Sequence, residues 1–176
     1  YMTSHMPSST AINSVVAAFG LAPVRGVPGG PLNGIALHVI TDERIAHSAT
    51  IAYDTGTPSF LSLKESYFGT SAERALPVNI PDLLEAKRQF FHYAMFIHQD
   101  TNSLLGSGYG DRPGNDIVIS LGGGFVGHVG SNDQQAGTLM HEIGHNLGLD
   151  HGGNNADNCK PNDPSVRNYL LQFDKD

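Results

Sequence analysis

The string HEIGHNLGLDH, which begins at His141, restricts the fold of this chain more than any other feature of its sequence. On a helix, His141 and His145 project from one face, one turn apart, so both imidazoles can reach one zinc ion at about 2.0–2.1 Å. Glu142 then lies beside the metal, where it can accept a proton from a zinc-bound water. His151 can supply a third nitrogen if the helix ends at Gly148 and the chain turns back. Three protein ligands with an open fourth position are typical of a catalytic zinc site.

A helix over the first part of this string is predicted on two grounds. Ser131 and Gln134 fit a capping box at its start. Apolar residues then recur at steps of four, three and four, which gives one apolar stripe along a helix that runs to about residue 147. The stripe consists of Ala136, Met140, Ile143 and Leu147. The histidines are displaced from this stripe and can face a cleft. The alternative is three ordinary surface or core histidines, because H-E-x-x-H alone also arises by chance.

The full pattern H-E-x-x-H-x-x-G-x-x-H is the extended signature of the metzincin zinc metallopeptidases. The chain resembles this family over about residues 35–173, and in particular its small microbial members with a minimal catalytic domain. The resemblance implies an α+β fold with a mixed twisted sheet, a backing helix, an active-site helix and a short C-terminal subdomain. It also implies a zinc-dependent endopeptidase that cuts peptide or protein substrates through a zinc-bound water activated by Glu142. Secretion is expected from the resemblance only.

The rest of the chain predicts a few further elements. Strands are expected at residues 35–41, 90–98 and 116–121, and helices at 61–68 and 81–89. By the resemblance, the three strands belong to the upper sheet and residues 107–111 form its edge. An extended substrate would pair with that edge through backbone hydrogen bonds. The glycines at 106, 108 and 110 fit a plain loop equally well.

One position departs from the family pattern. Metzincins carry a Met-turn beneath the zinc, often S-x-M-x-Y, and the matching string from Ser165 to Tyr169 has Arg167 in the methionine position. A buried guanidinium without a partner is strongly unfavourable. We therefore expect either that the loop turns Arg167 toward water or that the metal site is weakened. Tyr169 matches a tyrosine that in some metzincins binds zinc at rest or steadies the oxyanion; the alternative is a core tyrosine.

The N-terminal part of the chain is predicted to precede the catalytic domain. Residues 1–6 (YMTSHM) resemble a tag remnant or a processed end and carry no weight in the fold prediction. Residues 7–34 are rich in Pro, Gly and Ser, which is typical of a loose leader or linker. The catalytic domain is expected at residues 35–176. Whether the leader is an inhibitory propeptide, so that the chain is a zymogen, stays open.

Several other groups have a functional and a plain interpretation. Cys159 could block the open zinc position and hold the enzyme latent, but a lone cysteine is more often an ordinary thiol. Asp150 could orient a histidine ligand or be a solvent-facing turn residue. Acidic and Asn-rich pieces at residues 110–116 and 154–163 could supply oxygen ligands for calcium, although they lack EF-hand spacing. The remaining strand and loop histidines are expected to be structural or exposed: His38, His47, His92, His98 and His128.

The charge balance argues against two classes of partner. The chain has 10 Lys and Arg against 17 Asp and Glu, a formal net charge of -7, and no basic run. Nucleic acids and anionic membranes need clustered cations, so neither is expected. No apolar run approaches the ~18–20 residues that span a bilayer. The sequence does not predict an oligomeric state.

Two rival functions are weighed against the peptidase. A deformylase-like zinc hydrolase would have a cysteine ligand upstream of the helix, whereas Cys159 lies downstream of it. A zinc scaffold that binds proteins without cutting them is kept open by Arg167. Glu142 argues against the scaffold, because such a protein would be free to lose this carboxylate.

Overall fold

The computed structural model describes residues 1–24, 26, 33–76, 80–101 and 106–173. Its helices and strands are, in chain order, α1 (Ser9–Gly20), α2 (Phe60–Tyr67), α3 (Ser71–Arg74), α4 (Ile80–Arg88), β1 (Tyr93–Ile97), β2 (Gly108–Gly110), β3 (Asp116–Ser120), the short 3-10 helix η1 (Val126–His128) and α5 (Asn132–Asn146). The fold is therefore a small α+β fold. The predicted helices at 61–68 and 81–89 correspond to α2 and α4, and their presence is confirmed.

The three strands form one mixed sheet in the order β1-β3-β2. β1 and β3 are parallel, and β2 pairs antiparallel with β3, so β2 is an edge of the described sheet. This confirms the predicted strands at 116–121 and 107–111. The strand predicted at 90–98 is shorter than expected. Phe90 and Phe91 instead close a turn after α4, where both N–H groups bond to the carbonyl of Lys87, and both rings are exposed.

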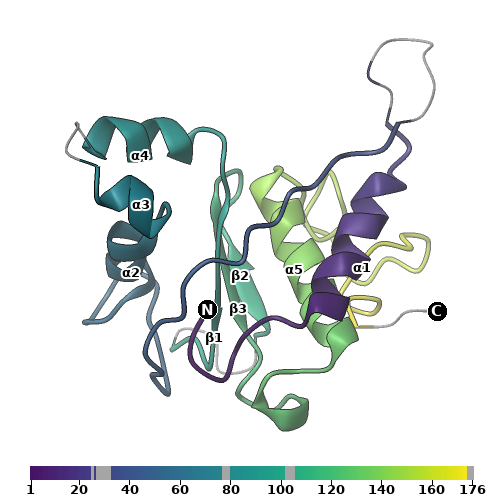
Figure 1. The fold of residues 1–176 in the computed structure, drawn as a ribbon. Helices are drawn as coiled ribbons and strands as arrows, with labels where there is room; N and C mark the ends of the chain where they lie inside the picture. The colour runs from purple at the N-terminus through teal and green to yellow at the C-terminus, as the bar shows by residue number, and fades with distance from the viewer. Residues whose placement is uncertain (25, 27–32, 77–79, 102–105, 174–176) are drawn as a thin grey trace.

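The sheet is covered on both faces, as Figure 1 shows. Side chains alternate along a strand, so neighbouring residues of β3 enter different cores. Val118 packs with Phe60 of α2 on one face. Ile117 and Ile119 pack on the other face with Leu139 and Ile143 of α5. α1 lies beside α5 and contributes Val15 to that second core. The sheet is therefore the middle layer, and α5 lies directly on it.

The start of α5 follows the predicted capping box. The Ser131 hydroxyl accepts from the Gln134 N–H, and the Gln134 side chain accepts from the Ser131 N–H. The apolar stripe is partly confirmed: Ile143 is buried, whereas Leu147 at the end of the helix is 56% exposed. Because α5 also contacts β2 and α1, its buried surface is wider than one stripe.

The strand predicted at residues 35–41 is wrong. This stretch forms no ladder in the described structure, and Val39 and Ile40 are exposed. The free edge of β1 is instead approached by the N-terminal residues, since the Met2 N–H donates to the carbonyl of Phe96. Ile45 in turn pairs with Met2. An alternating pattern becomes a strand only where a partner edge is available, and here the edge is taken.

The N-terminal residues belong to the fold, contrary to the sequence prediction. Met2 is fully buried in the core under α2. Residues 9–20 form α1 rather than a loose linker, and the Ser8 N–H donates to the side chain of Gln135 on α5 at 2.7 Å. Most of residues 25–32 lie outside the described residues. The limits proposed for the catalytic domain, residues 35–176, stay a prediction.

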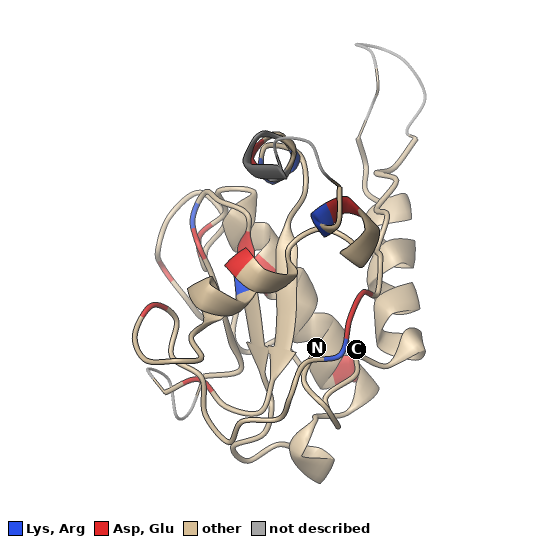
Figure 2. Ribbon diagram, turned by 60° about the vertical axis from the view of Figure 1, so that its left-hand side comes forward, with Lys and Arg blue, Asp and Glu red and all other residues tan. Residues whose placement is uncertain are grey.

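Figure 2 shows the charged residues scattered over the ribbon, with Lys and Arg at single positions. Among the described residues, five Lys or Arg side chains form ion pairs with carboxylates. None of the described helices is both long and apolar enough to cross a membrane.

Candidate metal centre

Helix α5 presents His141 and His145 side by side, one turn apart. Their ring centroids are 5.0 Å apart, and the rings are nearly perpendicular. His141 is 2% exposed because it lies under the loop that contains Val166. The two imidazoles therefore project from one face of the helix, as predicted.

The third histidine comes from the turn after α5. Gly148 has φ +88°, in the left-handed region that favours glycine, and there the chain leaves the helix axis. A tight turn between Asp150 and Gly153, closed by two backbone hydrogen bonds, then holds His151. The His151 ring lies 5.4 Å from that of His141 and 5.0 Å from that of His145. One ring nitrogen from each histidine lies within 4.8 Å of the others, so the three could hold one metal ion.

Backbone carbonyls orient two of these rings. Nδ1 of His141 lies 2.8 Å from the carbonyl oxygen of Val166, and Nδ1 of His145 lies 3.0 Å from that of Leu149. A carbonyl only accepts, so Nδ1 of His141 carries the proton, whereas Nδ1 of His145 also faces the guanidinium of Arg167, a donor, at 2.6 Å. The lone pair of His141 is then on Nε2, which is the usual state of a histidine that binds a metal.

Burial keeps all three imidazoles neutral. It lowers the pKa of His141 to about 3 and that of His145 to about 4, and it also lowers the pKa of His151. The positive charge of Arg167 adds to the effect at each ring. A neutral imidazole is the form that binds a metal, so the site is ready for a cation at neutral pH.

Glu142 is 4% exposed and lies between α5 and the edge strand β2. A Cβ at Gly108 would be 2.9 Å from its Oε1, and a Cβ at Gly110 would be 3.1 Å from its Oε2. Both positions therefore need glycine for this carboxylate to fit. Burial raises the pKa of Glu142 to about 8, and nearby Arg167 partly offsets that rise. A cation on the histidines would lower this pKa, since a positive charge favours the carboxylate.

Tyr169 lies at the edge of the three histidines. Its hydroxyl is 2.9 Å from Nε2 of His151, and the two rings are 4.5 Å apart. The side chain is not a core tyrosine, because Tyr169 is 51% exposed. A molecule bound at the three histidines could therefore contact the Tyr169 hydroxyl.

Arg167 is buried, so the first of the two expected alternatives, that it turns toward water, is wrong. It is 3% exposed and donates to three backbone carbonyls, those of His141, Leu149 and Asp150. Gly144 makes room for it, because a Cβ there would lie 2.7 Å from the Arg167 Cδ. The carbonyls satisfy the guanidinium, which removes the main cost of its burial. The sequence could not reveal these partners, since they are main-chain atoms.

The same guanidinium lies against His145, one of the three histidines. Its Nη2 atom is 2.6 Å from Nδ1 and 3.0 Å from Nε2 of His145. This places a fixed positive charge beside the metal position, where a methionine would be neutral. Arg167 thus replaces an apolar floor with a charged and hydrogen-bonded one.

The other predicted groups lie outside the histidine cluster. The Asp150 carboxylate pairs with Arg112 and makes no hydrogen bond to a described histidine. Cys159 is exposed and is not among the described side chains that could share one ion. Asp111, in one of the two pieces considered for calcium, instead accepts from the Asp116 N–H and from Asn146. His92 bonds to Asn146, as expected of a structural histidine.

Comparison with known families supports the chemistry of this site. The family model described as Peptidase M66 matches residues 87–163. No curated protein and no solved structure matches the chain. The matched stretch contains the three strands, α5 and all three histidines, but ends before Arg167 and Tyr169. Over this stretch the chain is therefore similar to a metallopeptidase family.

Proposed function

We propose that the chain is a zinc-dependent endopeptidase of the metzincin type. The observation that carries the proposal is the convergence of His141, His145 and His151, with one ring nitrogen of each within 4.8 Å, next to the buried carboxylate of Glu142. The family match to a peptidase supports hydrolysis of peptide bonds as the reaction.

The three imidazoles fit zinc as the metal. Three neutral nitrogen donors with space for a fourth ligand are typical of catalytic zinc sites. His141 has its Nδ1 atom on a backbone carbonyl, which leaves the Nε2 lone pair for a cation. When bound, zinc would polarise the scissile carbonyl and make the attacking water more acidic.

Glu142 is assigned the proton transfers. As the water oxygen attacks the carbonyl carbon, the Glu142 carboxylate takes a water proton. It then gives that proton to the amide nitrogen as the carbon–nitrogen bond breaks. The tight fit against Gly108 and Gly110 restricts the positions open to the carboxylate, so it should need little reorganisation.

Tyr169 and Arg167 are assigned supporting roles. The Tyr169 hydroxyl, on an exposed side chain beside His151, can donate to the oxyanion that forms at the carbonyl. Arg167 fixes the loop after His151 to α5 by linking the carbonyls of His141 and Asp150.

The edge strand β2 is the proposed place for the substrate backbone. β2 pairs with β3 on one side, and its other side is an edge of the described sheet. Gly108 and Gly110 face Glu142, whereas Tyr109 points to the opposite face and packs on Tyr53. An extended peptide that pairs with this edge would run past the carboxylate, and its main-chain bonds would not depend on sequence. Secretion is proposed from the family resemblance alone.

Denatured casein is a suitable first substrate, because an enzyme that reads the backbone should cut an unfolded chain. The purified chain should cleave it, lose activity to a chelator and regain it when zinc is added. His145→Ala should lose both cleavage and the zinc ion that His141, His145 and His151 share. Cleavage that survives complete metal removal would contradict the proposal, and zinc binding without any cleavage would favour a non-cutting scaffold.

A further inference from the structure

A second group of three histidines lies outside the centre described above. His5 from the N-terminal segment, His47 from the loop before residue 51, and His98 directly after β1 come together, and we name them the N-terminal histidine cluster. One ring nitrogen of each lies within 4.8 Å of the others. The three segments are far apart in the sequence, so the fold brings the rings together.

The geometry of this cluster is close to that of the centre on α5. Its ring centroids are 5.4, 5.1 and 5.3 Å apart for the three pairs. The corresponding distances between His141, His145 and His151 are 5.0, 5.4 and 5.0 Å. The rings of the N-terminal histidine cluster are thus spaced like those of the centre on α5. They offer a metal ion the same set of three nitrogen donors.

A backbone carbonyl orients the buried ring of the cluster. Nδ1 of His5 lies 3.1 Å from the carbonyl oxygen of Thr3, so this nitrogen carries the proton. Nε2 of His5 therefore has a lone pair, and it faces Nδ1 of His98 at 3.1 Å. This arrangement matches that of His141, whose Nδ1 also donates to a carbonyl. Either a proton on His98 or a cation can lie between the facing nitrogens, and the third ring, His47, favours the cation.

His98 is held in place by close packing. A Cβ at Gly122 would lie 2.3 Å from the carbonyl oxygen of His98 and 2.8 Å from its ring, so glycine is needed there. His128 stacks on the His98 ring at 5.9 Å and bonds through Nδ1 to the Gly122 carbonyl at 2.9 Å. Burial, together with the other histidines, lowers the pKa of His98.

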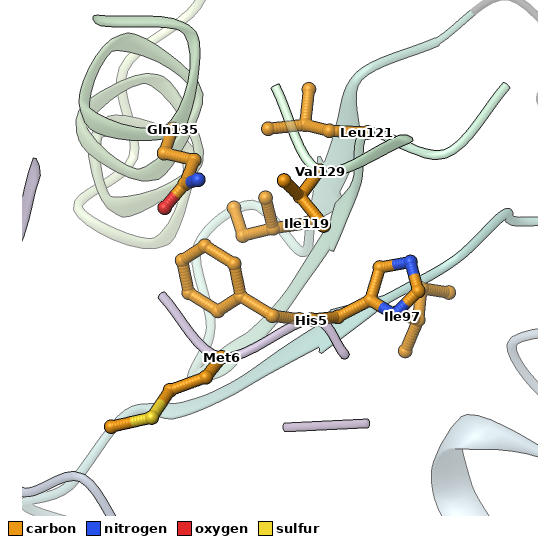
Figure 3. Close-up of a pocket in the computed structure, with 8 residues that line it drawn as sticks. His5, Met6, Ile97, Ile119, Leu121, Val129 and Gln135 are labelled. Carbon is orange, nitrogen blue, oxygen red and sulfur yellow. The ribbon is translucent and has the colours of Figure 1, made fainter. Parts of the chain in front are cut away.

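One side of His5 borders a small, mostly apolar cavity. Figure 3 shows His5 and Met6 beside Ile97 and Ile119, at a small cavity of about 10 Å³. That volume holds no more than about one water molecule. His5 is 6% exposed, and Met2, three residues earlier, is fully buried. His47 is exposed and His98 is half-buried, so the three rings are open to an ion from solvent.

We propose that His5, His47 and His98 bind a second divalent transition-metal ion of the zinc type. Three imidazole nitrogens suit zinc, copper or nickel rather than the hard cations calcium and magnesium, which prefer oxygen. Since His5 belongs to the N-terminal segment and His98 to the end of β1, the ion ties this segment to the sheet. The bond to metal adds to the backbone bond between Met2 and Phe96 in the same region. Its role is to stabilise the fold.

Metal counting on the full-length, untagged chain tests this proposal. After exposure to zinc and removal of the excess, elemental analysis should find about two zinc per parent chain. His47→Ala should bind about one. His47 is exposed, so its replacement should leave folding intact, and His38→Ala is the matched control because His38 is also exposed. His38→Ala should keep two.

A second set of variants tests the N-terminal histidine cluster in a chain that lacks the centre on α5. A chain with His145→Ala and His151→Ala keeps the N-terminal histidine cluster and should bind about one zinc, which should raise its thermal midpoint. Adding His47→Ala to that chain should abolish both the bound zinc and the rise. The proposal is overturned if His47→Ala leaves the metal content unchanged in both backgrounds.

Discussion

Replacing Gly110 by alanine should disturb the contact between the edge strand and the active-site helix. The added Cβ would lie 2.8 Å from the backbone oxygen of Glu142, 3.1 Å from its Oε2 and 3.2 Å from the Cβ of His145. The backbone oxygen belongs to α5 and cannot rotate away, so β2 and α5 have to separate by a few tenths of an ångström. The change therefore acts on packing and on the catalytic carboxylate together.

The size of the effect follows from known costs of overpacking. An extra methyl group in a packed region destabilises by about 1–3 kcal/mol. For a chain of this length, each kcal/mol corresponds to about 2–4 °C in the thermal midpoint. Gly110→Ala should therefore melt roughly 2–12 °C lower than the parent. Because Glu142 also moves relative to the substrate edge, kcat/KM on casein should fall by about tenfold.

Gly20→Ala is the matched control for this substitution. A Cβ at Gly20 has no atom within 4 Å, and the residue has no positive φ. It should melt at the parent temperature or slightly above, because alanine restricts the unfolded chain. Thermal unfolding and cleavage are to be measured on both variants. If Gly110→Ala is as stable and as active as Gly20→Ala, the packing of β2 on α5 described above is wrong.

Two further predictions concern Arg167 and pH. Arg167→Met loses three carbonyl partners and should destabilise the metal-free chain by about 2–4 kcal/mol. It should nevertheless bind zinc more tightly in a chelator competition, because a cation is removed from beside His145. Arg167→Lys should be destabilised without the gain in zinc affinity. The metal-free chain should be most stable near pH 6.5. Below that pH the stability falls, because the unfolded chain protonates His141 and His145, whose folded pKa values are about 3 and 4. Between pH 6.5 and 8 the stability also falls as pH rises, because the folded chain still holds a proton on Glu142, whose pKa is about 8. Denaturant midpoints across pH test this. Glu142→Gln should remove the loss between pH 6.5 and 8 and should steepen the loss on the acid side, because Glu142 opposes the effect of the histidines between pH 4.5 and 6.5.

The parts of the fold that local sequence determines were predictable. The cap at Ser131, the spacing of the histidines on α5 and the turn at Gly148 depend on residues within one or two turns of each other. The strand at residues 35–41 failed because pairing depends on which edge is free, and that edge of β1 is approached by Met2. Alternation alone carries no information about a distant competitor.

The sequence of α1 has the apolar spacing of a helix, but the residues that follow it hid this pattern. Ile12, Val15 and Phe19 follow helical spacing and all pack on the α5 side of the sheet. The Pro- and Gly-rich residues that follow made the whole region resemble a linker. The partners of Arg167 could not be predicted at all, because they are backbone carbonyls brought close by the turn after α5. The N-terminal histidine cluster was equally hidden, since its members lie in three distant segments.

Glu142→Gln, measured beside the parent for zinc content and casein cleavage in the same preparation, tests the central claim most directly. Glutamine keeps the shape of the side chain but cannot accept the water proton. The account predicts unchanged zinc content and a loss of cleavage of at least ~100-fold, the contribution expected of a general base. Cleavage at the parent rate with zinc fully bound would contradict the role of Glu142, and with it the proposed peptidase mechanism.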